Sequence, residues 1–205
     1  LNGITKKENG DIYIGAGTTF SHITNDPVIQ ENIPVLGEAV DQVGGPQIRN
    51  IGTIGGNICN GAVSADSAPT VFSLNALLRI EDANGGRTVP VRDFYLGPGR
   101  VDLKRGEILT HVIIPAKEYQ GYHGNYIKYS MRKAMDIATL SCSVVSKVNT
   151  EKNILEDVRI TFGVAAPVPF RCEKTEAALK GQEISEKLYE MTEQSIRQEI
   201  NPRDS

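Results

Sequence analysis

The sequence lacks the features that mark several classes of protein. No apolar run approaches the roughly 20 residues that a membrane-spanning helix needs, and no charged segment leads into the apolar stretch of a signal peptide. Basic residues are in the minority, 22 against 25 acidic ones, and they form no basic stripe of the kind that binds nucleic acid. We therefore expect a cytoplasmic protein with neither a membrane nor a nucleic acid as its partner.

Cysteine and histidine are scarce, with three residues of each. The cysteines Cys59, Cys142 and Cys172 lie far apart and form no C-x-x-C pair, which argues against a disulfide framework and against an iron–sulfur or zinc site made by this chain alone. The histidines share no metal-ligand spacing, and no Ser-His-Asp or Cys-His pair indicates a nucleophile. We expect no metal site, and small buried thiols in a reducing compartment.

What the sequence does contain is a series of strand and helix patterns in two parts. Polar, turn-like residues 116–124 predict a boundary between a domain of residues 1–116 and a second of residues 122–205. We expect a mixed or antiparallel sheet with helices in the first, and a three-stranded antiparallel sheet followed by helices in the second, which is an α+β fold. The predicted strands cover residues 11–14, 77–81, 87–91, 108–114, 126–131, 138–149 and 158–164. The predicted helices begin after Thr18 or Thr19 and cover residues 34–43, 67–75, 174–180 and 185–200.

Residues 44–67 carry six glycines and no helical periodicity. A segment of this length without secondary structure is usually functional or disordered in a compact domain. Its isoleucines, Ile48, Ile51, Ile54 and Ile58, favour burial, so we expect an ordered loop.

The glycine pair in this loop has the composition of a cofactor contact. Gly55 and Gly56 lack a Cβ atom, so the backbone can adopt positive φ angles and its N–H groups can form an anion-binding nest. Thr53 offers a hydroxyl and Asn57 an amide, and Asp66 can accept from a sugar hydroxyl or cap the next helix. These residues fit a nucleotide-like cofactor. By themselves they are more often a plain turn, and they match neither a P-loop nor a Rossmann fingerprint.

Several motifs, in order, resemble the FAD-binding subunits of molybdenum hydroxylases, and the xanthine dehydrogenase branch in particular. They are Gly45-Pro-Gln-Ile-Arg-Asn-Ile-Gly-Thr-Ile-Gly-Gly-Asn-Ile-Cys-Asn-Gly61, Ser64-Ala-Asp66, Phe94-Tyr-Leu-Gly-Pro-Gly99, Gly106-Glu-Ile-Leu109, Lys128-Tyr-Ser-Met-Arg132, Met135-Asp-Ile-Ala138, Phe162-Gly-Val-Ala-Ala-Pro167 and Arg171-Cys172. The resemblance implies the second subdomain of a PCMH-type FAD-binding domain, followed by a truncated CO dehydrogenase flavoprotein C-terminal-like domain.

The same resemblance implies a set of FAD-binding residues. Those in the glycine segment, Thr53, Gly55, Gly56 and Asn57, would contact chiefly the pyrophosphate and the ribityl chain.

Five further residues would complete the FAD pocket by the same resemblance. Gly44 and Ile48 would line it from the preceding turn, and Asp66 would bond to the ribose or adenosine side. Leu109 and Lys128 would border the flavin, because a leucine packs on an aromatic face and a lysine stabilises negative charge.

The function that the resemblance implies is electron transfer. Electrons would pass from a molybdopterin-binding subunit and a 2Fe-2S subunit to FAD on this chain, and from FAD to NAD. An alternative is the flavoprotein subunit of a nicotinate, carbon monoxide or aromatic-CoA enzyme. A second alternative is a non-catalytic docking fragment without FAD.

The chain also departs from the family pattern. The glycine-rich loop of the N-terminal subdomain is not among these residues, Ala65 stands where many relatives have a hydroxyl, and Val101 where many have threonine. Because the chain starts at Leu1 and stops at the polar residues 201–205, we expect an excised piece with one wall of the flavin pocket. Such a piece would bind FAD poorly and be inactive by itself.

Overall fold

Strands with alternating buried residues form the sheet of the first domain. In the computed structural model, which describes residues 1–200, the strand order is β1-β2-β7-β3-β4, and all neighbours are antiparallel. The strands are β1 (Ile4–Lys6), β2 (Ile12–Gly15), β3 (Leu77–Asp82), β4 (Gly85–Pro90) and β7 (Ile108–Ile114). The predicted strands of residues 77–81 and 87–91 are present and pair as a hairpin, with Leu77 opposite Pro90 and Asp82 opposite Gly85.

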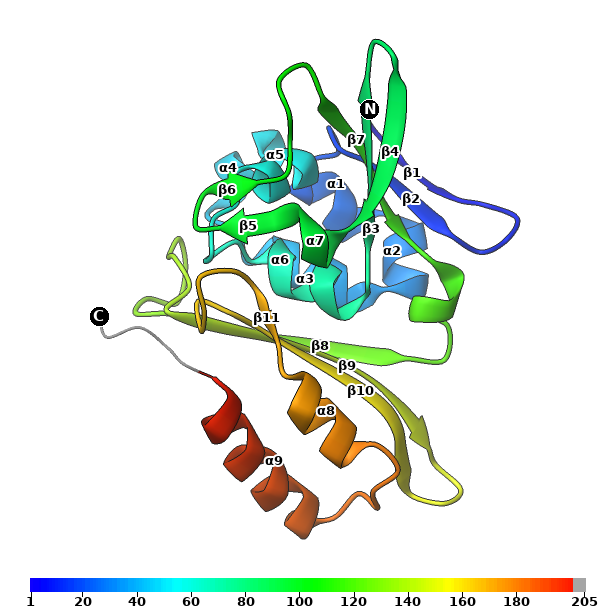
Figure 1. The fold of residues 1–205 in the computed structure, drawn as a ribbon, viewed down its shortest axis with the longest axis vertical. Helices are drawn as coiled ribbons and strands as arrows, with labels where there is room; N and C mark the ends of the chain where they lie inside the picture. The colour runs from blue at the N-terminus through cyan, green and yellow to red at the C-terminus, as the bar shows by residue number, and fades with distance from the viewer. Residues whose placement is uncertain (201–205) are drawn as a thin grey trace.

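Four short helices cover one face of this sheet (Figure 1). They are α1 (Phe20–Asn25), α2 (Pro27–Asn32), α3 (Pro34–Asp41) and α6 (Ser67–Ser73). The Thr19 hydroxyl accepts from the backbone N–H of His22 and so caps α1, as predicted.

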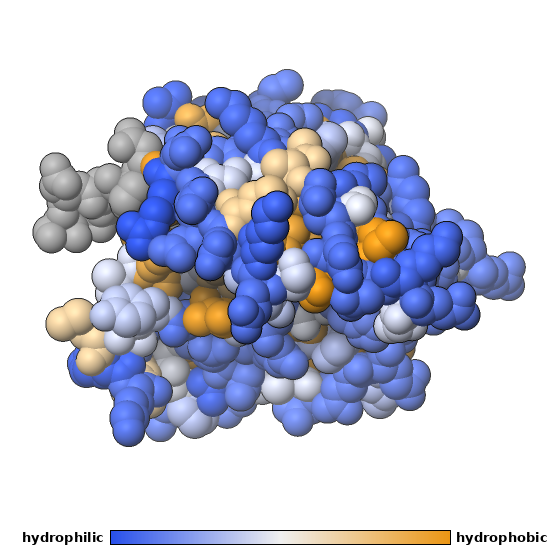
Figure 2. Space-filling view, turned by 90° about the horizontal axis from the view of Figure 1, so that it is seen from below, coloured by the Kyte–Doolittle hydropathy of each residue, from blue (hydrophilic) through white to orange (hydrophobic). Residues whose placement is uncertain are grey.

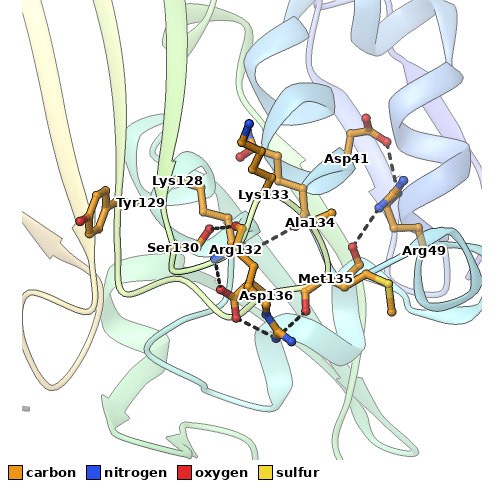
Figure 3. Close-up of a pocket in the computed structure, with 12 residues that line it drawn as sticks. Asp41, Arg49, Lys128, Tyr129, Ser130, Arg132, Lys133, Ala134, Met135 and Asp136 are labelled. Carbon is orange, nitrogen blue, oxygen red and sulfur yellow. Dashed lines mark hydrogen bonds and ion pairs between the residues drawn. The ribbon is translucent and has the colours of Figure 1, made fainter.

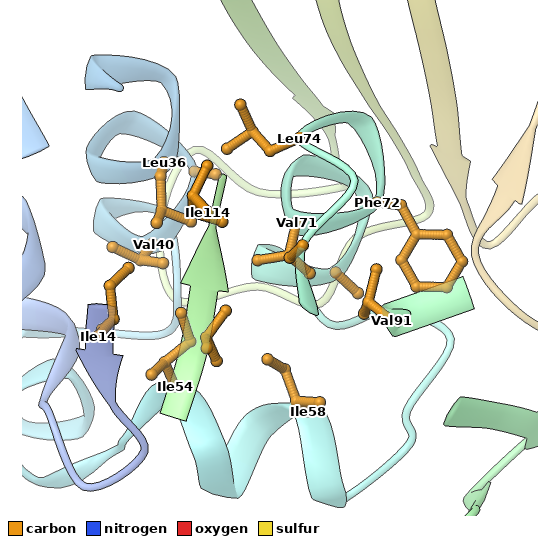
Figure 4. Close-up of a cluster of buried hydrophobic side chains, with 14 of the residues drawn as sticks. Ile14, Leu36, Val40, Ile54, Ile58, Val71, Phe72, Leu74, Val91 and Ile114 are labelled. Atoms are coloured by element: carbon orange, nitrogen blue, oxygen red, sulfur yellow. The ribbon is translucent and has the colours of Figure 1, made fainter. Parts of the chain in front are cut away.

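The core of the first domain lies between these helices and the sheet. Figure 4 shows Ile14 and Ile114 of the strands facing Leu36 of α3 and Val71 of α6, and all four are fully buried. The period of two in the strands and of about 3.6 in the helices brings these aliphatic side chains to the same layer.

The second domain is an antiparallel sheet with two helices on one face (Figure 1). Its strands are β8 (His123–Tyr129), β9 (Leu140–Asn149), β10 (Ile154–Gly163) and β11 (Phe170–Arg171), in the order β11-β10-β9-β8. The three predicted strands are present, and the two-residue β11 adds a fourth. The helices α8 (Glu173–Leu179) and α9 (Glu186–Glu199) follow, and Gly181, with a φ of +80°, ends the first of them. The polar run 201–205 lies outside the described residues.

The other face of the second sheet contacts the first domain through α3 and α6. Figure 2, viewed from the side of α8 and α9, shows a largely hydrophilic surface in which apolar residues form small, separate patches. Within residues 1–200, no helix combines the length and the apolar character that crossing a membrane requires.

Residues 91–101 and 116–118 are more regular than the sequence predicts. Residues 91–101, for which the sequence predicts no element beyond Val91, form α7 (Val91–Phe94) and a small hairpin of β5 (Tyr95–Gly97) and β6 (Arg100–Val101). The 3-10 helix η1 (Ala116–Glu118) begins the connection to the second domain.

Arg159 of β10 contacts both the first domain and the connection between the domains. Its side chain is 7% exposed, and its guanidinium donates to the backbone carbonyls of Ser73 and Glu118. It also pairs with the Glu118 carboxylate at 3.0 Å and lies 4.3 Å from the centroid of the Tyr122 ring. The Ser73 carbonyl belongs to the last turn of α6, where backbone acceptors lack helical partners, so a cation there is favourable.

Candidate functional site

The glycine-rich segment is helical, so the predicted long loop is wrong. It forms α4 (Pro46–Ile51) and α5 (Ile54–Cys59), and both glycines of the pair lie in α5. Positive φ angles occur instead at Gly44 (+50°) and Gly61 (+62°), which flank the two helices. The anion-binding nest expected at the glycine pair is therefore absent. What distinguishes these two glycines from other helical residues is that they lack a Cβ atom.

Only half of the isoleucines in this segment are buried, contrary to the prediction. Ile54 and Ile58 of α5 are fully buried, whereas Ile48 and Ile51 of α4 are 50% and 75% exposed. The α5 pair is spaced by four residues and therefore shares one helix face, which packs into the first-domain core.

Gly55 allows α5 to touch the end of β2. Its backbone N–H donates to the Ala16 carbonyl at 2.9 Å. A Cβ atom on Gly55 would lie 2.5 Å from the Ala16 Cβ and 2.7 Å from the Ala16 carbonyl oxygen, which is too close for any side chain. Gly55 is thus required by the packing of the chain itself.

Contacts within the chain do not require a glycine at position 56 as they do at position 55. It is exposed, and a Cβ atom on it would meet only the Thr53 hydroxyl oxygen, at 3.0 Å. That hydroxyl caps α5 by accepting from the Gly56 N–H at 3.1 Å. A Cβ at this distance requires the capping hydroxyl to shift by a few tenths of an ångström, whereas a Cβ on Gly55 would require the backbone of Ala16 to move.

A glycine hollow of about 380 Å³ lies beside this pair. Its lining includes Ala16, Gly17, Gly55, Gly56, Cys59 and Leu109, so three of the nine predicted site residues come together here. Leu109 is 4% exposed in β7. The lining is mainly apolar and backbone, which suits the flat, apolar part of a ligand.

A second hollow of about 460 Å³, here called the cationic hollow, lies between Arg49 of α4 and the residues at and after the end of β8 (Figure 3). Four basic residues, Arg49, Lys128, Arg132 and Lys133, and two acidic ones, Asp41 and Asp136, line it together with Gly44, so it brings together two more predicted residues, Gly44 and Lys128. Ile48 borders Gly44, because a Cβ on that glycine would lie 3.1 Å from the Ile48 side chain. Arg49 donates to the carbonyls of Val43 and Gly44, at 3.2 Å each, and so anchors the chain entering α4.

Lys128 and Asp66 form a buried ion pair, with side chains 6% and 7% exposed. The Lys128 ammonium donates to Asp66 Oδ2 and to the Gln42 carbonyl, both at 2.9 Å. The Tyr126 hydroxyl donates to Asp66 Oδ1 at 2.7 Å. Burial raises the pKa of Asp66, and the hydrogen bonds from Lys128 and Tyr126 and the charge of Lys128 oppose that rise.

The structure corrects one of the two alternatives for Asp66. The residue occupies the cap position of α6, but its side chain makes no capping hydrogen bond. Asn57 likewise has an internal partner, because its Oδ1 accepts from the Ser67 hydroxyl at 2.7 Å.

Sequence reasoning missed Tyr126, Gln42, Arg132 and Cys59 as members of these sites. Tyr126 could have been found, because it precedes Lys128 by two residues in a predicted strand and must share its face. The other three depend on contacts across the fold. Within residues 1–200, no three or more histidine, cysteine or acidic side chains gather closely enough to hold a metal ion.

Two protein-family models match the chain. The one described as the FAD binding domain in molybdopterin dehydrogenase matches residues 1–117, and the one described as the CO dehydrogenase flavoprotein C-terminal domain matches residues 125–205. Together they define the class, an FAD-binding domain joined to the C-terminal domain of these flavoproteins.

Individual relatives agree with the class. The xanthine dehydrogenase FAD-binding subunit of Escherichia coli O157:H7 is 39% identical over 205 residues, which are 100% of this chain and 70% of that protein. The nicotinate dehydrogenase FAD-subunit of Eubacterium barkeri is 32% identical over 188 residues, 90% of this chain and 63% of that protein. A structure of carbon monoxide dehydrogenase from Hydrogenophaga pseudoflava has a TM-score of 0.92 and 30% identity, covering 100% of this chain and 69% of that one.

The chain therefore belongs to the family of FAD-binding subunits of molybdenum hydroxylases. The resemblance and the α+β fold expected from the motifs are confirmed.

The two glycines of α5 are expected to respond differently to alanine. Gly55→Ala should lower the free energy of unfolding by about 1–3 kcal/mol, because the new methyl overlaps the backbone of Ala16. Gly56→Ala, the matched control on the same helix, should change it by less than about 1 kcal/mol, because the better helix preference of alanine is opposed by the 3.0 Å contact with the Thr53 hydroxyl. Denaturant unfolding of both variants measures the difference. Equal effects of the two substitutions would contradict the packing argument.

Proposed function

We propose that this chain is part of the FAD-binding electron-transfer subunit of a xanthine dehydrogenase-type molybdenum hydroxylase. The observation that carries the proposal is Gly56, an exposed helical glycine that lines the glycine hollow and at which a Cβ would meet only the Thr53 hydroxyl, at 3.0 Å. A dinucleotide cofactor that lies against the backbone at this position would leave no room for a side chain, which explains the glycine. The name and 39% identity of the Escherichia coli O157:H7 relative support the xanthine dehydrogenase branch.

The described residues fit FAD in shape and chemistry. Residues 44–57 lead from the cationic hollow to the glycine hollow, so an extended dinucleotide along them contacts both. The predicted FAD ligands are distributed along this path: Gly44, Ile48, Thr53, Gly55, Gly56, Asn57, Asp66, Leu109 and Lys128.

Each group of ligands has a separate task in this proposal. Thr53 and the glycine pair hold the pyrophosphate and ribityl part, where backbone must come close. Leu109 packs on one flat ring of the dinucleotide in the glycine hollow, and Lys128 places a positive charge beside the flavin at the cationic hollow. Asp66 supports that charge through its ion pair at 2.9 Å.

FAD, when bound, supplies the redox chemistry, and the protein orients it and tunes its potential. Its electrons come from a molybdopterin-binding subunit and a 2Fe-2S subunit, and NAD is the acceptor in this proposal. The domain boundary between residues 116 and 122 is supported by the two family matches, which end at 117 and begin at 125.

The 205 residues by themselves are expected to bind FAD weakly and to be inactive. The matched Escherichia coli O157:H7 protein is longer, since the alignment covers 70% of it. In this proposal, residues that such relatives have in addition complete the pocket. A tight one-to-one FAD complex of the isolated 205 residues would contradict this part of the proposal.

Gly56→Ala tests the proposed cofactor contact. In the complete subunit, FAD is expected to bind at least about tenfold more weakly, because a methyl group intrudes where the cofactor approaches the backbone. Titration with FAD, followed by flavin absorbance near about 450 nm, measures the affinity. Since the fold of this variant is expected to be intact, a loss reports on the cofactor alone.

Two outcomes would overturn the proposal. Complete, folded wild-type subunit that takes up no FAD would favour a non-catalytic docking function. An assembled enzyme that oxidises nicotinate and not hypoxanthine would assign the subunit to the branch of the Eubacterium barkeri relative.

A further inference from the structure

Alternation along β8 places Tyr126 and Lys128 on the same face of the second sheet. Successive strand residues point to opposite faces, so these two point toward the first domain. Between and after them, Ile127 and Tyr129 are 64% and 65% exposed on the other face. On β9, the residues opposite Tyr126 and Lys128 are the small buried residues Ser143 and Ser141, which leave room for the long side chains.

Both oxygens of the Asp66 carboxylate are held by this face. Oδ1 accepts from the Tyr126 hydroxyl at 2.7 Å, and Oδ2 accepts from the Lys128 ammonium at 2.9 Å. Tyr126 and Asp66 are each 6% exposed. Because the Asp66 side chain does not cap α6, its orientation is set by these two partners on β8.

The Lys128 ammonium has three N–H donors. Two of them are accounted for by Asp66 Oδ2 and by the Gln42 carbonyl, each at 2.9 Å. Lys128 also lines the cationic hollow beside Gly44 and Arg49 (Figure 3). These two hydrogen bonds hold the ammonium in place and leave one N–H that can donate to a ligand in that hollow.

We infer that Tyr126 is a positioning residue of the FAD site, acting through Asp66 on the Lys128 ammonium. The inference rests on the proposed function, because it takes FAD to be the ligand of the cationic hollow. Tyr126 does not contact the cofactor. Its hydroxyl fixes one carboxylate oxygen of Asp66, so that only the other oxygen receives Lys128. Without the hydroxyl, the carboxylate can rotate and the ammonium loses its fixed direction.

Tyr126→Phe in the assembled holoenzyme tests this inference. The phenyl ring is retained, and the loss of one hydrogen bond to a charged group is smaller than the stability of a typical domain, so the variant is expected to fold. FAD is expected to bind about tenfold more weakly. The flavin reduction potential is expected to shift to more negative values, because a less well placed cation stabilises reduced flavin less. FAD titration and spectroelectrochemistry measure the two effects.

Tyr189→Phe is the matched control, since Tyr189 lies on α9 with 67% exposure. It is expected to change neither the FAD affinity nor the flavin potential. A purely structural function of the Tyr126 hydroxyl would lower the thermal stability and leave the potential of the bound flavin unchanged. That result would overturn the inference.

Asp66→Glu serves as a second variant if Tyr126→Phe does not fold. It keeps the charge and moves the carboxylate by one methylene, so the potential should again become more negative. An unchanged potential in folded Asp66→Glu protein would overturn the inference. If the assembled wild-type enzyme takes up no FAD, the proposed function itself is overturned, and with it the inference. Wild-type holoenzyme that binds FAD normally, together with an unaffected Tyr126→Phe variant, would refute only the inference.

Discussion

Replacing Lys128 by methionine is expected to lower the free energy of unfolding by about 3–5 kcal/mol, because it leaves the buried Asp66 carboxylate without its cation. The Gln42 carbonyl also loses its donor. Denaturant unfolding of the wild type and the variant gives the difference. FAD affinity of the complete subunit should fall in parallel.

Lys117→Met is the matched control. Lys117 pairs with Glu118 at 3.8 Å, but its side chain is 82% exposed. An exposed pair of this kind contributes about 0–1 kcal/mol, so the control should unfold almost as the wild type does. A deficit of the Lys128 variant no larger than that of the control would contradict the prediction.

The loss of unfolding free energy caused by Lys128→Met is expected to depend on pH, because it arises from the Asp66 carboxyl group. Burial raises the pKa of Asp66, and the substitution removes both the hydrogen bond and the charge with which Lys128 opposes that rise. A carboxyl whose pKa is higher in the folded state contributes its stability below the unfolded pKa of about 4, and loses that contribution as the pH rises through the folded value. The deficit in the free energy of unfolding should therefore shrink as the pH falls toward the unfolded pKa of about 4.

Replacing both members of the pair separates charge burial from packing. Asp66→Leu combined with Lys128→Met should be more stable than Lys128→Met alone, because no unpaired charge remains. If the double variant is the less stable of the two, the unpaired carboxylate is not the source of the deficit.

Arg159→Met is the second substitution with a large expected effect, again a loss of about 3–5 kcal/mol. The guanidinium is 7% exposed and its partner Glu118 is 14% exposed, so methionine leaves a nearly buried carboxylate without its arginine. The carbonyls of Ser73 and Glu118 lose donors as well. Because these groups belong to α6 and to the connection between the domains, hydrogen exchange should become faster in both segments.

Arg197→Met provides the comparison for Arg159. Arg197 pairs with Glu193 one turn away on α9 at 2.7 Å, and the two side chains are 75% and 64% exposed. Such a helical pair contributes about 0.3–0.5 kcal/mol. Comparable unfolding midpoints for the two variants would show that Arg159 does not hold the domains together.

The regular elements were largely predictable because they depend on local patterns. The strand Ile108–Ile114 and the hairpin that begins at Leu77 follow from apolar alternation and from turn glycines. Helix α3 begins at Pro34, whose fixed φ suits a first turn. The family also followed from the order of motifs, since several short runs in one order are far more specific than any single run.

Helices α4 and α5 were not predictable by the same means. Each has six residues, which is too short for an isolated helix to be stable, and glycine makes α5 weaker still. Tertiary hydrogen bonds replace the missing local preference. The N–H groups of Ile54 and Gly55 donate to the carbonyls of Thr18 and Ala16, which belong to the turn after β2.

The sequence by itself therefore determined the strands, the longer helices, the family and the set of residues that are candidates for FAD. Only the tertiary structure decided that Gly55 packs against Ala16 while Gly56 meets only the Thr53 hydroxyl, because the difference lies in the position of Ala16. It also decided that Asp66 meets Lys128 and Tyr126, since 62 and 60 positions separate it from them in the chain. Local patterns report on neighbours within one or two turns, and contacts across such separations arise only when the two domains pack.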